Sequence, residues 1–128
     1  MTVRGPDFVI AVVDDDQSIL RSLEYLLESA DYAVRSFTSA AALLDSNCVH
    51  EVDCLISDID MPGIDGFQLL EQIRAVRPRL PAIFITGYPE RLKQLPSLGD
   101  INPRVFTKPF RAEEFLAAIC ESLASSPR

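Results

Sequence analysis

Short, uninterrupted apolar runs recur along this chain, and each ends abruptly at a polar residue or a turn. The run F-V-I-A-V-V over residues 8–13 ends at three aspartates, and A-I-F-I-T over Ala82–Thr86 ends at Gly87. A run without polar alternation is typical of a strand that is covered on both faces. Because strands of this kind belong mostly to parallel sheets with helices on both sides, the pattern favours an α/β fold.

A third run leads into the stretch C-L-I-S-D-I-D-M-P-G-I-D-G over residues 54–66. Leu55 and Ile56 place Ser57 and Asp58 at the end of a buried strand, and the proline and glycines that follow stop regular pairing. In open α/β sheets this edge is where ligands bind. An Asp before a turn can also serve only as a cap or an Asx-turn acceptor, so Asp58 by itself does not identify a site.

Segments with helical periodicity lie between the runs. Asp16 is a plausible N-cap for a helix over residues 17–30, in which apolar residues recur three and four positions apart. Between Thr86 and Arg104, any helix is limited to about two turns, over residues 90–95, by Pro89, Pro96, Pro103 and Gly99. We therefore predict a doubly wound, five-stranded parallel sheet whose fourth helix is short or irregular. The remaining predicted elements are strands at Ala33–Phe37 and Arg104–Thr107, helices at Ala40–Asp45, 66–76 (with Val76 on its inner face) and 112–123, and a connection over 47–51.

Composition excludes several classes of protein. A length of 128 residues suits one domain, and a formal charge of −7 disfavours a nucleic-acid surface, which needs basic residues. The three cysteines form no C-x-x-C motif, so neither a disulfide framework nor a zinc site is indicated, and His50, the single histidine, lies in a connection and receives no role. No leader and no run of about 18 apolar residues is present, which predicts a cytoplasmic protein without a membrane span.

The predicted strand ends bring chemically active residues to one edge of the sheet: Asp14, Asp15, Asp58, Thr86 and Lys108. At about 4 Å and an effective dielectric constant near 20, each pair of carboxylates repels by about 4 kcal/mol. Protonation of one carboxyl group or a bound divalent cation would relieve this repulsion, and an oxygen site with open positions suits Mg²⁺. A carboxylate beside a cation and a lysine can act as a nucleophile toward phosphorus.

These motifs together resemble the receiver domain of bacterial response regulators, the phosphoacceptor module of two-component signalling. The resemblance is carried by the acidic pair in V-V-D-D-D, the acceptor in L-I-S-D-I-D-M-P-G-I-D-G, the hydroxyl in I-F-I-T-G and the lysine in T-K-P-F, and it covers nearly the whole chain. It implies a flavodoxin-like fold and a single receiver domain over residues 1–128, with its core at about 8–124.

By this resemblance, Asp58 accepts a phosphoryl group from a phosphohistidine on a histidine kinase or histidine phosphotransfer protein. The family's Mg²⁺ would be bound by the side chains of Asp15 and Asp58, by Asp14 through water, and by the backbone carbonyl of Asp60. The product would signal to a downstream protein or to an output domain absent from this chain, and a phosphorylation-dependent dimer is one outcome known for the family.

The resemblance also assigns roles beyond the acceptor, and here the sequence departs from the family. Lys108 would pair with phosphoryl oxygens, Thr86 would hydrogen-bond one of them, and the Lys108-Pro109 peptide would be cis. The family's aromatic switch residue is replaced by Val105. Phe106 follows it, but strand alternation points Phe106 to the other face and into the core.

Residues outside the acceptor position are expected to affect how the phosphorylated domain signals and how long the phosphoryl group lasts. The proline-rich segment 88–103 lacks the alanine-rich helix of the family, so we hypothesise that ordering or loosening of this segment carries the signal. Asp60 and Tyr88 occupy positions that tune hydrolysis of the phosphoryl group in the family. The sequence leaves open whether these two residues speed or slow that hydrolysis.

Two other functions compete with this interpretation. A receiver-like interaction module would bind partners without being phosphorylated. A phosphatase of the haloacid dehalogenase type would use Asp58 and Asp60 as nucleophile and acid, but its motif continues to Thr or Val where this chain has Pro62. We therefore expect a protein that is not a multiple-turnover enzyme, although an aspartyl phosphate would hydrolyse by itself. Because the sequence ends soon after the last helix, we expect either a single-domain regulator or part of a longer one.

Overall fold

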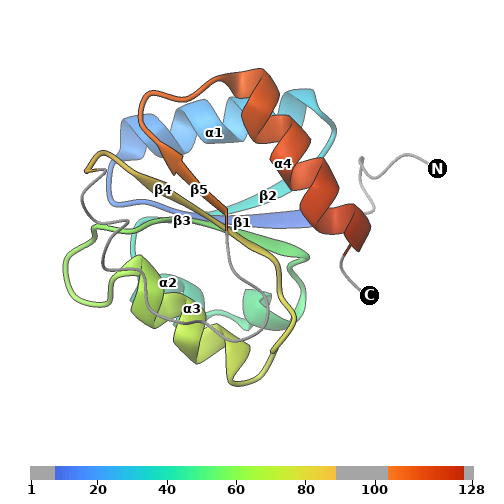
Figure 1. Cartoon of the computed structure of the whole chain (residues 1–128). Coiled ribbons are helices and arrows are strands. Elements are labelled where there is room, and N and C mark those ends of the chain that lie inside the picture. Colours follow the sequence, from blue (N-terminus) through green and yellow to red (C-terminus); the bar gives the residue numbers. More distant parts are fainter. Residues whose placement is uncertain (1–7, 89–103, 126–128) are drawn as a thin grey trace.

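A computed structural model describes residues 8–88 and 104–125 of the chain, and within them the strands form one five-stranded parallel sheet in the order β2-β1-β3-β4-β5 (Figure 1). This order and the parallel pairing confirm the predicted doubly wound α/β fold. The short helix predicted at 90–95 lies outside the described residues. The elements are β1 (Val9–Val13), α1 (Gln17–Ser29), β2 (Ala33–Phe37), α2 (Ala40–Asp45), the 3-10 helix η2 (Asn47–His50), β3 (Cys54–Asp58), α3 (Gly66–Arg74), β4 (Ala82–Thr86), β5 (Arg104–Thr107) and α4 (Ala112–Ser125).

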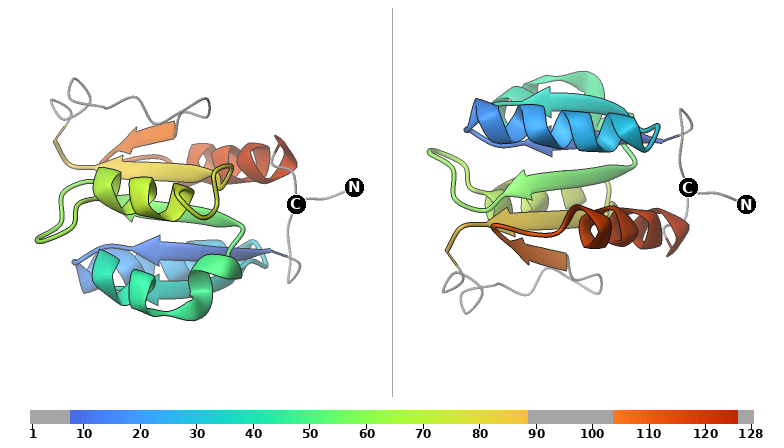
Figure 2. Two further views of the ribbon diagram at one scale, coloured as in Figure 1. Left: turned by 90° about the horizontal axis from the view of Figure 1, so that it is seen from below. Right: turned by 90° about the horizontal axis from the view of Figure 1, so that it is seen from above.

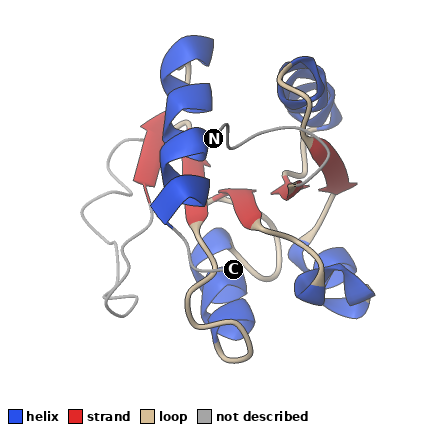
Figure 3. Ribbon diagram, turned by 90° about the vertical axis from the view of Figure 1, so that its right-hand side faces the viewer, coloured by secondary structure: helices blue, strands red, loops and turns tan. Residues whose placement is uncertain are grey.

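The sheet separates two hydrophobic cores. Helices α1 and α4 cover one face and helices α2 and α3 cover the other (Figures 1 and 2). Along β1, Ile10 and Val12 pack under α1 and α4, whereas Ala11 and Val13 pack under α2 and α3. This arrangement explains the uninterrupted apolar runs, because successive residues of a strand face opposite sides and here both sides are buried. Figure 3 shows the strands enclosed between the helices.

Side-chain caps fix where the helices begin. Asp16 caps α1 as predicted, and its carboxylate accepts a hydrogen bond from the backbone N–H of Ser18 at 2.9 Å. Asp65 and Gln68 form a capping box at the start of α3, with distances of 2.8 and 3.0 Å. These contacts satisfy backbone donors that have no partner inside the helix. Helix α3 consequently starts at a fixed position, directly after the loop that follows Asp58.

Two local predictions were wrong. Helix α3 ends at Arg74 instead of residue 76, and Val76 is 60% exposed instead of lying on the inner face, because the chain has already left the helix there. Residues 47–50, predicted as a connection, form the 3-10 helix η2. The Ser46 side chain caps it by accepting from the N–H of Cys48, and Val49 is buried against the core under α2 and α3.

The alternation predicted for β5 is confirmed. Val105 packs against the core under α2 and α3, while Phe106 contacts the core under α1 and α4. The Phe106 ring lies edge-on to the rings of Phe115 and Phe110, with centroid distances of 5.3 and 5.8 Å. Phe106 is therefore a packing residue, and the position next to it carries no aromatic ring. Within the described residues, no helix is long and apolar enough to cross a lipid bilayer.

Gly66 lets helix α3 approach the end of β3 closely. A Cβ atom at this position would lie 2.6 Å from the carbonyl oxygen of Asp58 and 3.0 Å from the Cα of Ile59. The backbone N–H of Gly66 also donates to the Ile59 carbonyl at 3.0 Å. Because the neighbouring atoms belong to the backbone, any side chain here would have to displace the strand end that carries Asp58.

We expect Gly66→Ala to lower the free energy of unfolding by about 1 to 3 kcal/mol, the usual cost of overpacking a closely packed site. Gly87→Ala is the matched control, since a Cβ there meets nothing within 4 Å and should change stability by less than about 0.5 kcal/mol. Urea unfolding followed by circular dichroism measures both variants. Equal stability of the two would contradict the close approach.

Candidate functional site

The carboxyl ends of four strands bring the predicted site residues together. Asp14 follows β1, Asp58 ends β3, Thr86 ends β4 and Lys108 follows β5. Strand β3 is hydrogen-bonded to β1 on one side and to β4 on the other. Since all of these strands run in the same direction, their polar ends share one edge of the sheet. This is the edge at which the sequence predicted a site.

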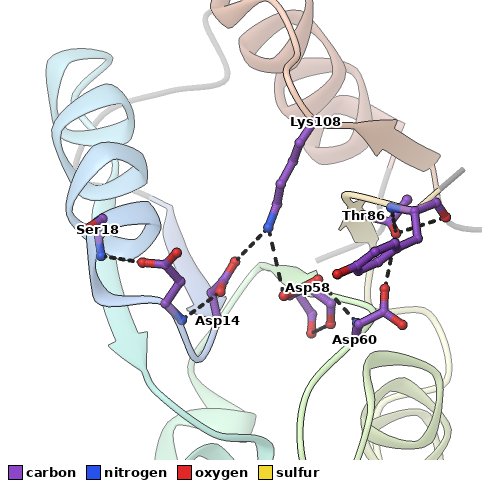
Figure 4. A network of polar contacts seen from close by, with 9 residues as sticks. Asp14, Ser18, Asp58, Asp60, Thr86 and Lys108 are labelled. Atoms are coloured by element: carbon purple, nitrogen blue, oxygen red, sulfur yellow. Dashed lines mark hydrogen bonds and ion pairs between the residues drawn. The ribbon is translucent and has the colours of Figure 1, made fainter.

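The acidic side chains lie close enough to share one ligand. Carboxylate oxygens of Asp14, Asp15 and Asp58 all lie within 4.8 Å of one another. The Nζ atom of Lys108 reaches between two of them, 3.6 Å from Oδ2 of Asp14 and 3.9 Å from Oδ2 of Asp58 (Figure 4). These side chains border a cavity of about 440 Å³. Its lining consists of Asp14, Asp15, Asp16, Ile19, Asp58, Asp60, Gly87, Tyr88 and Lys108.

Burial and hydrogen bonding differ among the three carboxylates. Asp14 and Asp58 are 1% and 7% exposed, whereas Asp15 is exposed. Oδ1 of Asp14 accepts from the N–H of Asp16 at 2.9 Å, and Oδ1 of Asp58 accepts from the N–H of Asp60 at 3.2 Å. Oδ2 of Asp14 is buried, and residues 8–88 and 104–125 provide it with no hydrogen-bond donor. A buried acceptor of this kind calls for another positively charged or donating group.

The protonation behaviour of the site follows from this burial. Burial, and after it the negative charge of Asp14, raise the pKa of Asp58 to about 6, although Lys108 acts in the opposite direction. Burial likewise raises the pKa of Asp14, against the opposing effects of its hydrogen bond from Asp16 and of Lys108. One lysine therefore does not offset the cost of holding the two buried carboxylates in their charged forms.

The residues present fit a divalent cation. Three carboxylate oxygens converge, one buried oxygen lacks a hydrogen bond, and the donors are all hard oxygen ligands of the kind that Mg²⁺ prefers. The cavity leaves space for water or a phosphoryl oxygen to complete the coordination. The juxtaposition predicted for Asp14, Asp15, Asp58 and Lys108 is confirmed, and the Lys108-Pro109 peptide is cis as the resemblance implied. The ligand roles remain predictions.

Thr86 belongs to the same edge, but its hydroxyl is directed elsewhere. Oγ1 of Thr86 lies 3.2 Å from Oδ2 of Asp60 and 3.3 Å from the carbonyl oxygen of Tyr88, and it accepts from the Tyr88 N–H at 3.0 Å. The family resemblance assigns only the backbone carbonyl of Asp60 a role, so this side-chain contact was not predicted. Asp60 lies two positions after Asp58 and Tyr88 lies two positions after Thr86, but only the adjacency of β3 and β4 brings the two pairs together.

The pKa of Asp58 generates a prediction about stability. A carboxyl group whose pKa rises from 3.8 to about 6 on folding binds its proton more tightly in the folded state. Its charged form therefore costs stability above pH 6, roughly 3 kcal/mol at most, and this cost disappears as the pH falls toward 3.8. In the presence of a chelator, we expect Asp58→Asn to increase the free energy of unfolding by about 1 to 3 kcal/mol at pH 8, and by less at pH 5.

Urea titrations at pH 5, 6, 7 and 8 would measure this difference. Asp45→Asn, at the exposed end of α2 and outside the cavity lining, is a control that should change stability by less than about 0.5 kcal/mol. A gain in the Asp58 variant that is the same at every pH would show that the carboxylate is not a source of electrostatic destabilisation.

Comparisons with known proteins match this geometry. The sequence model of the response regulator receiver domain family matches residues 10–120. The response regulator protein TodT of Pseudomonas putida is 33% identical over 120 residues, which are 94% of this chain and 53% of TodT. The transcriptional regulatory protein FixJ of Azorhizobium caulinodans is 34% identical over 117 residues, 91% of this chain and 56% of FixJ. The chain thus spans about half the length of these curated relatives.

Solved structures show the same fold. The signal receiver domain of an HD domain-containing protein from Pseudomonas fluorescens has a TM-score of 0.81 and 31% sequence identity, with 94% of this chain and 96% of that chain covered. A response regulator receiver domain protein from Clostridium thermocellum has a TM-score of 0.80 and 25% identity, with coverages of 91% and 94%. From its sequence match, its fold and the acidic edge of its sheet, this chain belongs to the response regulator receiver domain family of two-component signalling.

Proposed function

We propose that Asp58 accepts a phosphoryl group from a phosphohistidine on a histidine kinase or histidine phosphotransfer protein, with residues 1–128 acting as one receiver domain. The observation that carries this proposal is the convergence of Asp14, Asp15 and Asp58 around a cavity that Lys108 enters. A carboxylate nucleophile, a cation site and a fixed positive charge are the groups that phosphoryl transfer to an oxygen requires.

The transfer breaks the P–N bond of the phosphohistidine and forms a P–O bond to a carboxylate oxygen of Asp58. The imidazole nitrogen keeps the electron pair of the broken bond and takes a proton from solvent. Asp58 must be ionised to attack, and a pKa of about 6 leaves it mostly ionised at neutral pH. Lys108 is positioned to neutralise the transferred oxygens, since its Nζ already lies 3.9 Å from Oδ2 of Asp58.

Mg²⁺ would be held by the side chains of Asp15 and Asp58, by Asp14 through water, and by the backbone carbonyl of Asp60. When bound, it would neutralise charge on the carboxylates and polarise the phosphoryl oxygens. The chain's own contribution is to keep these carboxylates close together before the ion arrives. Strand pairing and the hydrogen bond from the Gly66 N–H to the Ile59 carbonyl hold the end of β3 in place.

The phosphorylated side chain would be a switch and not the intermediate of a multiple-turnover enzyme. A haloacid dehalogenase mechanism needs Asp60 to protonate a leaving group, but here the Asp60 carboxylate accepts a hydrogen bond from Thr86. We propose that the aspartyl phosphate instead hydrolyses slowly in the open cavity. A receiver-like module that is never phosphorylated is the second candidate, favoured by Val105 in place of a switch ring.

Phosphorylation would add about 1.5 to 2 negative charges to a site that contains one lysine among the residues bordering its cavity. Lys108 and Thr86 would move toward the new oxygens and alter the surface around β4 and β5. The partner that reads this surface would be a downstream protein, an output domain or a second copy of the chain, in the cytoplasm and without direct contact to nucleic acid. The hypothesis that segment 88–103 carries the signal concerns mostly residues outside those described.

Incubation with acetyl phosphate and Mg²⁺ tests the proposal directly. Intact-mass spectrometry should show one added phosphate on the wild-type protein and none on Asp58→Asn or after chelation of the metal. Phosphotransfer from a kinase of the source organism should label the same residue. No increment on a folded wild-type protein would support the unphosphorylated module.

Metal binding is a separate prediction. Mg²⁺ at 100 times its dissociation constant should stabilise the wild-type protein by about 2.7 kcal/mol. Asp15→Asn removes a proposed ligand without removing a buried charge, and should weaken Mg²⁺ binding by about tenfold or more. Asp16→Asn is the control, because it lies beside the cavity and retains an oxygen for the cap on α1. Thermal unfolding across a Mg²⁺ titration measures the affinity of both variants. An equal loss of Mg²⁺ affinity in the two variants would argue against a specific site.

A further inference from the structure

The side chain of Asp60 contacts the hydroxyl that the proposed switch would have to move. Oδ2 of Asp60 lies 3.2 Å from Oγ1 of Thr86, and the Asp60 N–H donates to Oδ1 of Asp58 (Figure 4). Asp60 therefore touches both the proposed acceptor and the residue proposed to sense it. Its carboxylate also borders the cavity in which a phosphoryl group on Asp58 would lie.

In the part of the chain that the structure describes, the hydroxyl of Thr86 has two hydrogen-bond acceptors within reach. Thr86 is fully buried, and its oxygen already accepts a hydrogen bond from the Tyr88 N–H. Its single proton can be donated to Asp60 or, at 3.3 Å, to the Tyr88 carbonyl. The carboxylate is the stronger acceptor of the two, because hydrogen bonds to charged groups are stronger than those to neutral ones. The resting structure thus directs the hydroxyl away from Asp58.

We propose that the Asp60 carboxylate is a latch that holds the Thr86 hydroxyl away from the acceptor until a phosphoryl group competes for it. Asp60 is then a positioning residue that sets how far the equilibrium lies toward the unphosphorylated arrangement. A phosphoryl group on Asp58 can draw Thr86 inward only when the hydrogen bond between Thr86 and Asp60 breaks. The free energy of that hydrogen bond therefore reduces the free energy by which phosphorylation favours the inward position of Thr86. This inference rests on the proposed function and adds to it the residue that resists the switch.

The latch differs from simple charge repulsion, in which Asp60 would only disfavour an anion in the cavity. Asp60→Asn removes the charge but retains an oxygen that can accept from Thr86. Asp60→Ala removes both the charge and the acceptor. Repulsion alone predicts that the two variants behave alike, whereas the latch predicts a larger effect for Asp60→Ala.

The first experiment titrates beryllofluoride, a phosphoryl mimic, into the full chain at saturating Mg²⁺. Binding of Mg²⁺ alone is measured for each variant, so that the mimic is always added to metal-loaded protein. We expect Asp60→Ala to bind the mimic about three to ten times more tightly than Asp60→Asn, the range that the loss of one hydrogen bond gives. In a Thr86→Val background, which lacks the hydroxyl, this difference should disappear.

The second experiment observes Thr86 itself in the protein without metal or mimic. With threonine methyl groups labelled, the resonance of Thr86 should move in Asp60→Ala toward its position in the wild-type protein with Mg²⁺ and beryllofluoride. In Asp60→Asn it should move less. Thr86→Ser, which lacks the methyl group, identifies the Thr86 resonance by its absence. Should the wild type fail to bind the mimic, the wild-type spectrum without ligand is the reference, and an unmoved Thr86 resonance in Asp60→Ala overturns the latch.

The outcomes separate the two proposals. A wild-type protein that binds Mg²⁺ and beryllofluoride, with equal affinities for the mimic in Asp60→Asn and Asp60→Ala, overturns the latch and leaves the phosphoacceptor role intact. The latch is also overturned if Asp60→Asn and Asp60→Ala still differ in their affinity for beryllofluoride when Thr86 is replaced by Val, because the hydroxyl is then not involved. A folded wild-type protein that binds no mimic overturns the phosphoacceptor role, and the methyl spectra decide the latch independently.

Discussion

Electrostatic repulsion among carboxylates at one edge of the sheet is the constraint on which the site depends. Asp14 and Asp58 are almost completely buried, and an oxygen of the exposed Asp15 lies within 4.8 Å of an oxygen of each. Lys108 contacts both buried groups, yet the pKa of Asp58 is still raised to about 6. The fold therefore holds the carboxylates in a costly arrangement that a bound cation would stabilise, which is a common way for a protein to prepare a site before its ligand arrives.

The two hydrophobic cores make this arrangement rigid. Strand β3 is buried along its whole length between β1 and β4, with helices packed on both faces. Gly66 brings the start of α3 against the carbonyl group of Asp58, and the capping box of Asp65 and Gln68 fixes where that helix starts. Packing and backbone pairing thus hold the backbone of Asp58 in place, in addition to the contacts that its side chain makes within the site. A change at Gly66 would consequently alter the site without touching its polar residues.

Most of the fold could be predicted from the sequence because its signals are local and agree with one another. Apolar runs indicate the strands, Asp16 caps α1 as predicted, and alternation places Phe106 in the core on the opposite face from Val105. The errors arose where local signals compete with packing. The apolar character of Val76 suggested a helical inner face, but the helix had already ended at Arg74, and residues 47–50 formed a 3-10 turn that buries Val49.

Which groups meet follows from the chain alone, since the parallel order of the strands carries every strand-terminal side chain to the same edge. Asp14, Asp15, Asp58 and Lys108 therefore converge there. The use of the Thr86 hydroxyl, in contrast, depends on the three-dimensional arrangement of its neighbours. Its contact with Asp60 joins residues 26 positions apart across neighbouring strands, and the direction of a buried hydroxyl depends on which acceptors the fold brings within reach. Such contacts leave no periodic signal in the sequence, because they depend on the positions of single atoms.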